Sequence, residues 1–215
     1  MRAAYVGPHF GEEPPISGTR GSGTVFFSGC SLRCSFCQNY QISCQGMGRP
    51  IDTSGLIVEI KEMIRVRGVH NVNFVTPDHF FPHVFRIVSK LRRDGLDIPM
   101  VYNTSGYQSV DSLRIASDYA DIYLPDFKYA EKDLAKRLSR CEDYPEVALN
   151  ALIEMVSQKG FLDVGASESL TAKRGVLVRH LLLPGHEKNS RDALTMLYLE
   201  FGKELPLSLM GQYQP

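Results

Sequence analysis

The chain has 215 residues, a length that suits a single domain with a sizeable buried core. Lysine plus arginine and aspartate plus glutamate number 24 each, so charge gives no case for binding nucleic acid or a membrane surface. The first residues lack the apolar core of a signal peptide, and no apolar run of about 18 residues is long enough to span a bilayer. We therefore expect a soluble, cytoplasmic protein in a reducing compartment.

Residues 1–23 are rich in glycine and proline, which predicts an irregular leading segment lying on the domain. The GTRGSG string in this segment precedes a predicted strand. A phosphate-binding loop would follow a strand and open a helix, so we exclude that interpretation.

From residue 24 two apolar patterns alternate. Nearly continuous apolar runs indicate strands buried on both faces, as parallel strands are, at residues 24–28, 71–76, 99–104, 121–127, 175–183 and 205–210. Between them apolar residues recur at helical spacing, within residues 56–64, 84–91, 111–118, 131–139, 147–156 and 193–201. Asp52 or Thr53 is a candidate cap for the first of these helices, and Asn189 or Ser190 for the last. The segment 157–175 has no clear period and is expected to be a loop or a short hairpin.

Six strands alternating with helices predict an α/β fold of successive right-handed βα units. A closed barrel of eight units takes about 250 residues, which is more than this chain has. We therefore expect one domain, in which residues 24–215 form an open six-stranded (βα)6 partial TIM-type barrel of parallel strands.

The loop after the first predicted strand, GCSLRCSFCQNY at residues 29–40, carries Cys30, Cys34 and Cys37. Three thiolates this close can share one inorganic centre. An iron–sulfur cube held by three cysteines leaves one iron with an open coordination position. The alternative, a structural zinc site, prefers four ligands and would have to recruit Cys44. Cys141 lies outside the spacing altogether.

The other predicted strands end in polar residues, and in βα barrels chemistry collects at the carboxyl ends of the strands. An arginine inside an apolar strand needs a buried partner. His79 and His83 are interpreted as ordinary residues of a helix start, with a metal pair as the alternative. The candidate site residues at or near strand ends are Thr76, Asn103, Ser105, Asp126, Lys128, Arg179 and Tyr213.

The C-x3-C-x2-C spacing, with Phe36 just before the last cysteine, resembles the radical S-adenosyl-L-methionine (SAM) superfamily. Within it, the chain looks most like the pyruvate formate-lyase activating enzymes and related activases that install a glycyl radical. The turn at residues 103–106, the Asp-Phe-Lys element at 126–128 and the strand at 179–185 resemble their motifs.

This resemblance implies a [4Fe-4S] cluster held by the three cysteines, with SAM bound on it, and an external one-electron donor such as flavodoxin or ferredoxin. It implies hydrogen abstraction by a 5′-deoxyadenosyl radical, with a glycyl-radical enzyme as the substrate. Modification of a small molecule or another peptide is the second interpretation. A zinc- or cluster-stabilised binding module is the third.

The resemblance also implies residue roles toward SAM. Arg179 and Lys128 would pair with its carboxylate, and Asp126 would bind the ribose, a cation or Lys128. Asn103 and Ser105 would donate or accept hydrogen bonds, and Phe36 would pack near the adenine. The superfamily's Gly-Gly-Glu element is absent: residues 75–78 read Val-Thr-Pro-Asp, so Thr76, Asp78 or backbone carbonyls would meet the amino group. Because Asn103 replaces an activase aspartate, binding of a monovalent cation stays open.

Overall fold

The computed structural model describes residues 1–163 and 171–211. Within these two ranges, seven strands form one sheet in the order β3-β1-β2-β4-β5-β6-β7, and two more form a parallel pair. The strands are β1 (Arg2–His9), β2 (Ser22–Phe27), β3 (Arg49–Pro50), β4 (Val72–Val75), β5 (Met100–Thr104), β6 (Ile122–Pro125), β7 (Gly175–Val176), β8 (Val178–Leu181) and β9 (Leu207–Met210).

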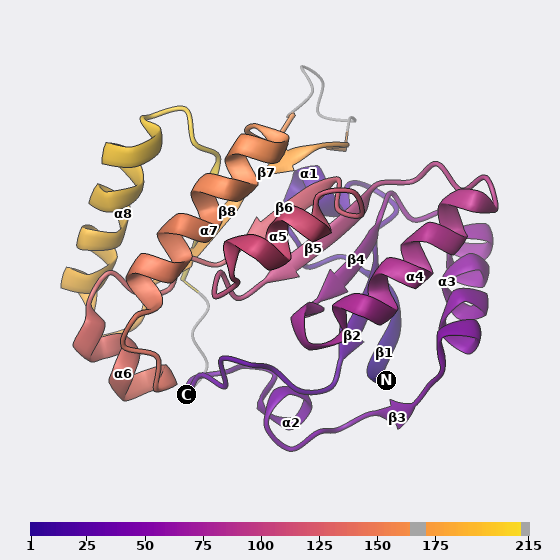
Figure 1. Cartoon of the computed structure of the whole chain (residues 1–215), viewed down its shortest axis with the longest axis horizontal. Helices are drawn as coiled ribbons and strands as arrows, with labels where there is room; N and C mark the ends of the chain where they lie inside the picture. The colour runs from indigo at the N-terminus through magenta and orange to yellow at the C-terminus, as the bar shows by residue number, and fades with distance from the viewer. Residues whose placement is uncertain (164–170, 212–215) are drawn as a thin grey trace.

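Helices follow the parallel strands and cover their outer side, as Figure 1 shows for α3, α4, α5 and α7. A short 3-10 turn at Asp78–Phe80 leads into α4. The helices are α1 (Pro14–Ser17), α2 (Tyr40–Ser43), α3 (Thr53–Arg67), α4 (Phe81–Arg93), α5 (Val110–Ala116), α6 (Lys132–Ser139), α7 (Tyr144–Lys159) and α8 (Glu187–Phe201).

The parallel strands confirm the open barrel. β2, β4, β5, β6 and β7 pair in parallel in that order, and β8 pairs in parallel with β9. An isolated parallel bridge between Asp126 and Arg179 continues the ladder from β6 to β8. Residues 175–181 thus act as one strand, interrupted at Leu177, and the parallel part of the fold has the six strands that the sequence predicts.

The expectation that residues 1–23 are irregular is wrong for most of their length. β1 pairs antiparallel with β2 over nearly all of its eight residues, with a register shift between Ala3 and Tyr5. Residues 10–21, including α1, then cross to the start of β2. Glycine and proline in β1 are tolerated because β1 lies on the outside of β2. Among the described residues, only the short β3 pairs with its far edge.

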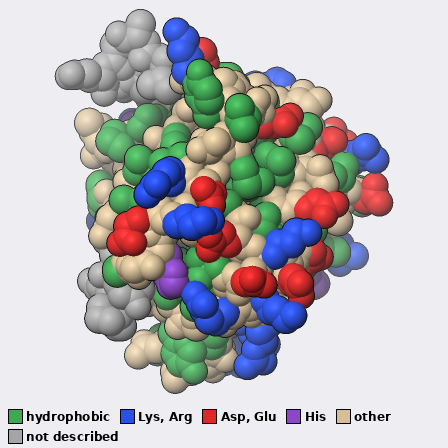
Figure 2. Space-filling model, turned by 90° about the vertical axis from the view of Figure 1, so that its left-hand side faces the viewer, with side chains coloured by type: hydrophobic (Ala, Val, Ile, Leu, Met, Phe, Trp, Pro, Cys, Tyr) green, Lys and Arg blue, Asp and Glu red, His purple; other side chains and the backbone are tan. Residues whose placement is uncertain are grey.

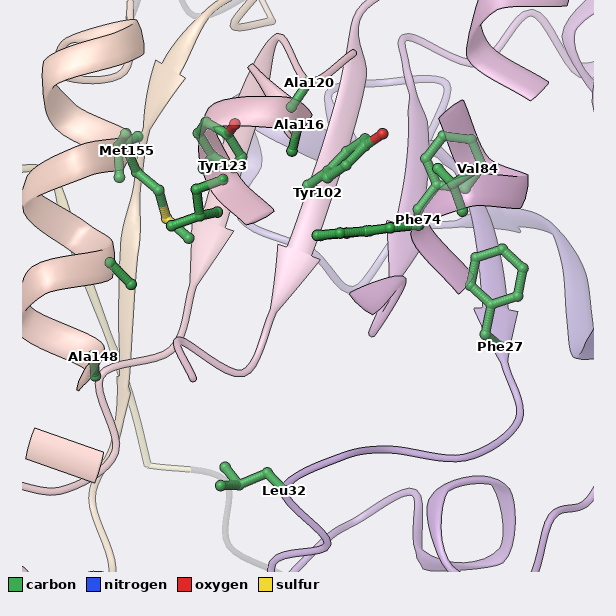
Figure 3. Packing of buried hydrophobic residues seen from close by; sticks show 14 of the residues in the cluster. Phe27, Leu32, Phe74, Val84, Tyr102, Ala116, Ala120, Tyr123, Ala148 and Met155 are labelled. Atoms are coloured by element: carbon green, nitrogen blue, oxygen red, sulfur yellow. The ribbon is translucent and has the colours of Figure 1, made fainter. Parts of the chain in front are cut away.

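A row of aromatic rings runs across the outer face of the parallel strands (Figure 3). Phe27 stacks on Phe74 with ring centroids 6.2 Å apart, and Tyr102 packs edge-on against both Phe74 and Tyr123. These four rings come from four adjacent strands and are all buried. Apolar residues of the covering helices, such as Val84 of α4 and Met155 of α7, complete this core.

A smaller apolar cluster fills the inside of the barrel. Ile16 of α1 is fully buried there, and its backbone oxygen accepts a 2.8 Å hydrogen bond from Asn71 Nδ2. The leading segment therefore plugs the barrel. The other members of this cluster are Val101, Ile122, Leu124, Leu162, Ala172 and Leu177.

Two predicted helix caps have different outcomes. Asp52 caps α3 as predicted, since its side chain accepts a 2.7 Å hydrogen bond from the Gly55 amide. The cap expected at Asn189 or Ser190 is wrong, because α8 begins at Glu187 after His186. Both residues are buried inside the helix, where their polar side chains bind neighbouring elements instead.

On the face formed around α6 and α8, basic and acidic side chains lie interspersed (Figure 2). Lys188, for example, bonds both Glu131 and Asp192. This face therefore carries no extended field of one sign. No helix among the described residues is both long and apolar enough to cross a membrane.

Candidate functional site

A cavity of about 640 Å³ opens at the carboxyl ends of the parallel strands. The cysteine loop forms one wall, and the ends of β4, β5, β6 and β8 form another. The leading segment reaches the cavity through Glu12 and Glu13. The fold thus gathers residues far apart in the sequence around one chamber.

The loop after β2 turns sharply to bring its cysteines to the cavity. Gly29 has φ +92, and a Cβ there would lie 3.2 Å from the His79 ring, so glycine suits this turn. Leu32 is buried and anchors the loop, and the Ser35 amide bonds the Leu138 carbonyl of α6 at 2.9 Å. The loop is therefore held between the strand and a distant helix.

Cys30, Cys34 and Cys37 all line the cavity, whereas Cys44 and Cys141 are not on its described wall. Cys34 is buried and the other two are half-buried. Burial raises the pKa of the Cys30 thiol, while amides of Arg33 and Leu32 and the Lys128 charge act in the opposite direction. A cation and backbone donors are thus positioned to stabilise a thiolate there.

The donor set at the cavity fits an iron–sulfur cluster. Three thiols spread over the wall of one cavity suit an iron–sulfur cube with one open iron.

Arg179, inside β8, has the buried partners that are expected for an arginine in an apolar strand. Its Nε donates to Asp126 Oδ1 at 3.0 Å, Nη1 to Glu12 Oε2 at 3.1 Å and Nη2 to Asn103 Oδ1 at 2.6 Å. The side chains of Arg179, Glu12 and Asp126 are only 12%, 7% and 14% exposed. The guanidinium therefore joins three other segments from inside the barrel.

Lys128 completes the charge balance of this network. Its Nζ donates to Asp126 Oδ2 at 2.6 Å, so two carboxylates face two cations. Burial raises the pKa of Asp126, but Arg179 and Lys128 outweigh it and the net shift is downward. Burial lowers the pKa of Lys128, but Asp126 and Cys34 outweigh it and the net shift is upward. Asp126 and Lys128 are thus both held in their charged forms.

Thr76 lies on the cavity wall in a strained conformation, with φ 48. A β-branched residue at positive φ costs free energy, and such strain is concentrated at functional sites. Its amide donates to the Asn103 carbonyl at 2.9 Å, and its hydroxyl lies 3.5 Å from the Gly29 carbonyl. Asp78, the other candidate from this loop, is not on the described cavity wall.

The turn after β5 packs directly on the end of β6. Gly106 has φ +78, and a Cβ there would lie 2.0 Å from the Asp126 carbonyl oxygen, which explains the glycine. The Tyr144 hydroxyl lies within hydrogen-bond distance of the carbonyl oxygens of both Ser105 and Asp126, and it donates to them. Ser105 Oγ accepts from Gln108 Nε2 at 3.3 Å.

The structure brings most predicted site residues to the same cavity. Phe36 lines it and packs edge-on against Tyr129, with ring centroids 6.2 Å apart. The roles assigned to these residues toward SAM stay predictions. The site residues on the described wall are Cys30, Cys34, Cys37, Phe36, Thr76, Asn103, Ser105, Asp126, Lys128 and Arg179.

Glu12 is a charged site residue that the sequence did not predict. It lies in the segment interpreted as irregular, and its Oε1 also accepts from Asn73 at 3.1 Å and Asn103 at 3.3 Å. The only signal for it was the unpaired arginine in a predicted strand. Tyr213 lies outside the described residues.

His79 lies in the 3-10 turn before α4, and His83 lies in the first turn of α4. The ring of Phe80 packs against both, and His79 Nε2 bonds the Ser28 carbonyl at 2.9 Å. The histidine pair therefore gains no third ligand among the described residues.

The chain is 29% identical over 216 residues to an uncharacterised protein of Methanocaldococcus jannaschii; the match covers 96% of this chain but 57% of that relative. The structure is similar to methylornithine synthase (PylB), with a TM-score of 0.55, 15% identity and coverage of 88% and 53% of the two chains. It is also similar to anSMEcpe with bound AdoMet, with a TM-score of 0.55, 12% identity and coverage of 86% and 50%.

These two structures are similar in fold alone, and this chain spans about half of each. In sequence, the chain also matches the model of a protein family, the radical SAM superfamily, over residues 24–194. The matched range takes in the cysteine loop and all but the last parallel strand. The chain belongs to the radical SAM superfamily.

Proposed function

We propose that this protein is an enzyme that holds a [4Fe-4S] cluster on Cys30, Cys34 and Cys37 and binds SAM beside it. When bound, and with one electron from an external donor such as flavodoxin or ferredoxin, these groups would supply cleavage of SAM and a 5′-deoxyadenosyl radical that abstracts hydrogen from a substrate. The observation that carries the proposal is the shared cavity wall, where the three cysteines face the polar strand ends.

The chain's own residues bind, orient and exclude water. The charge of Lys128 acts on both Cys30 and Cys34. Its ammonium is bonded to Asp126 within the described part of the chain, and we assign it to the SAM carboxylate. Arg179 is held by three acceptors and fixes Asn103 and Asp126 on the wall. Phe36, packed on Tyr129, supplies an apolar surface for the adenine.

The substrate is proposed from the motifs. The turn at residues 103–106, the 126–128 element and the strand at 179–185 resemble those of glycyl-radical activases, which supports a peptide glycine as the hydrogen donor. A small molecule or another peptide is the competing substrate class, since the same cavity admits either.

The first experiment is anaerobic reconstitution with iron and sulfide, followed by reduction, addition of SAM and chromatography for 5′-deoxyadenosine. We expect about four irons per chain and 5′-deoxyadenosine from the wild type, and loss of both in Cys34→Ala. Cys141→Ala and Cys44→Ala are the matched controls and should retain both. Zinc in place of iron, with loss of metal in Cys44→Ala, would instead support the binding module.

The substrate class is tested separately. The loaded protein, SAM and a reductant are mixed with a glycyl-radical enzyme of the pyruvate formate-lyase type, and the mixture is examined by electron paramagnetic resonance. A glycine-centred doublet that requires SAM supports activation. Formation of 5′-deoxyadenosine without that signal contradicts this pairing and favours the second substrate class.

A further inference from the structure

Each of the three cavity cysteines has a hydrogen-bond donor of the chain directed at its sulfur. For Cys30 the donors are the amides of Leu32 and Arg33. Arg33 has φ 47, a left-handed conformation that non-glycine residues seldom adopt. Successive amides turned in this way form a concave site for an anion. The loop therefore carries backbone strain where a thiolate is to be stabilised.

For Cys37 the donor is the hydroxyl of Ser43. A serine in a helix commonly bonds the carbonyl four residues earlier. Ser43, at the end of α2, instead places Oγ 3.2 Å from Cys37 Sγ and 3.6 Å from Cys44 Sγ. The residue is buried, and it lines the cavity beside the cysteine. Its one proton favours the nearer sulfur.

For Cys34 the donor is the hydroxyl of Tyr129, a fully buried residue after β6. This hydroxyl also lies 2.6 Å from Ser139 Oγ. Because its one proton goes to the Cys34 sulfur, the Ser139 hydroxyl donates to it. The Tyr129 ring is fixed by edge-on contacts with Phe36 and Tyr144. Packing from both sides thus holds the hydroxyl at the sulfur.

We propose that Ser43 and Tyr129 are positioning residues that set the reduction potential of the cluster, an inference that rests on the proposed function. Reduction adds negative charge to the cluster and its thiolates. A hydroxyl donating to a ligand sulfur stabilises that charge more in the reduced state than in the oxidised state, which raises the potential. Removing either hydroxyl makes the cluster harder to reduce.

The test is a redox titration of the reconstituted cluster without SAM, followed by electron paramagnetic resonance. Ser43→Ala and Tyr129→Phe should keep the wild-type iron content and shift the midpoint potential to more negative values. Ser43→Thr restores the hydroxyl and should return the potential toward that of the wild type. Ser35→Ala, on the same loop but exposed, and Tyr123→Phe, whose hydroxyl bonds Gln158, are matched controls and should not shift it.

Equal midpoint potentials in the wild type, Ser43→Ala and Tyr129→Phe would overturn this inference but would leave the proposed function standing. A shift in Ser43→Thr as large as that in Ser43→Ala would assign the effect to packing and also overturn it. If neither Ser43→Ala nor Tyr129→Phe retains the cluster, the hydroxyls serve assembly and the proposal is wrong. A wild-type protein that takes up no cluster contradicts the proposed function and this inference together.

Discussion

At the carboxyl end of β4, Asp78 has a buried carboxyl oxygen, Oδ1, with no hydrogen-bond partner among the described residues. Burial raises the pKa of this carboxyl to about 7, although Gln108 acts in the opposite direction. Asp126 is just as deeply placed, yet its pKa is lowered because two cations face it. Neighbouring charge, rather than depth, decides which of the two carboxyls is ionised.

This difference predicts a pH dependence of stability. The folded-state pKa of Asp78, about 7, lies above its ordinary value of 3.8, so between these values the folded state holds the proton more tightly. The free energy of unfolding should therefore fall as pH rises through this window, by at most about 1.4 kcal/mol per pH unit, and level off above it. Asp78→Asn should remove this contribution.

The measurement is urea unfolding of wild type and Asp78→Asn at several pH values across the window. The stability of the variant should rise relative to wild type as pH increases. Asp97→Asn, at an exposed position after α4, is the control and should run parallel to wild type. A constant difference between Asp78→Asn and wild type would show that the Asp78 carboxyl is ionised throughout.

At the residue scale, the sequence predicted the cysteines because their spacing is local. It predicted that Arg179 needs a partner but not that the partner is Glu12, because the two are 167 residues apart. Ser43 and Tyr129 carry no motif at all. Their hydroxyls matter only because packing places them at sulfur atoms.

At the scale of elements, α8 positions the loop that follows β6. Asn189 Oδ1 accepts from the Ala130 amide at 2.9 Å and the Glu131 amide at 3.3 Å, and its Nδ2 donates to the Lys128 carbonyl at 3.0 Å. A single buried amide thus satisfies three backbone groups of the segment that carries Lys128 into the cavity.

Asn189→Ala should lower the free energy of unfolding by several kcal/mol at most, since each unsatisfied buried group costs about 1–3 kcal/mol. Urea unfolding measures the change. Thr195→Ala, exposed on the same helix, is the control and should stay within about 0.5 kcal/mol of wild type. A neutral Asn189→Ala would mean that the β6 loop does not depend on α8.

The same residue shows why the helix boundary was predicted wrongly. Asn189 and Ser190 have the chemistry of helix caps, but here the polar side chains serve tertiary contacts. The six parallel strands were predictable because burial on both faces makes them continuously apolar. β1 was not, because its Gly7 and Pro8 favour a loop and its pairing with β2 is visible only in three dimensions.

At the scale of the whole molecule, the barrel is filled by side chains at one end and open at the other. Ile16 reaches the inner cluster from a segment outside the βα repeat, and its backbone is held by Asn71. The plug and the cavity therefore share the interior of one barrel. The leading segment therefore contributes Glu12 to the site itself, and it also supports the site from inside the barrel through Ile16.

Ile16→Ala should lower the free energy of unfolding by about 2–5 kcal/mol, the usual cost of removing a buried aliphatic side chain of this size. Ile115→Ala is the matched control, because Ile115 is 60% exposed on α5. The pair is compared by urea unfolding. Equal effects for the two substitutions would show that the barrel interior closes without the plug.

The ion pair between Glu12 and Arg179 also fixes an order of events during synthesis. Glu12 leaves the ribosome before the three cysteines, and Arg179 of β8 follows Glu12 by 167 residues. Contacts between segments so far apart in the sequence form slowly, because a long loop must close first. On the nascent chain, the three cysteines are therefore synthesised before the rest of the cavity wall. The complete cavity can form only after translation has passed Arg179.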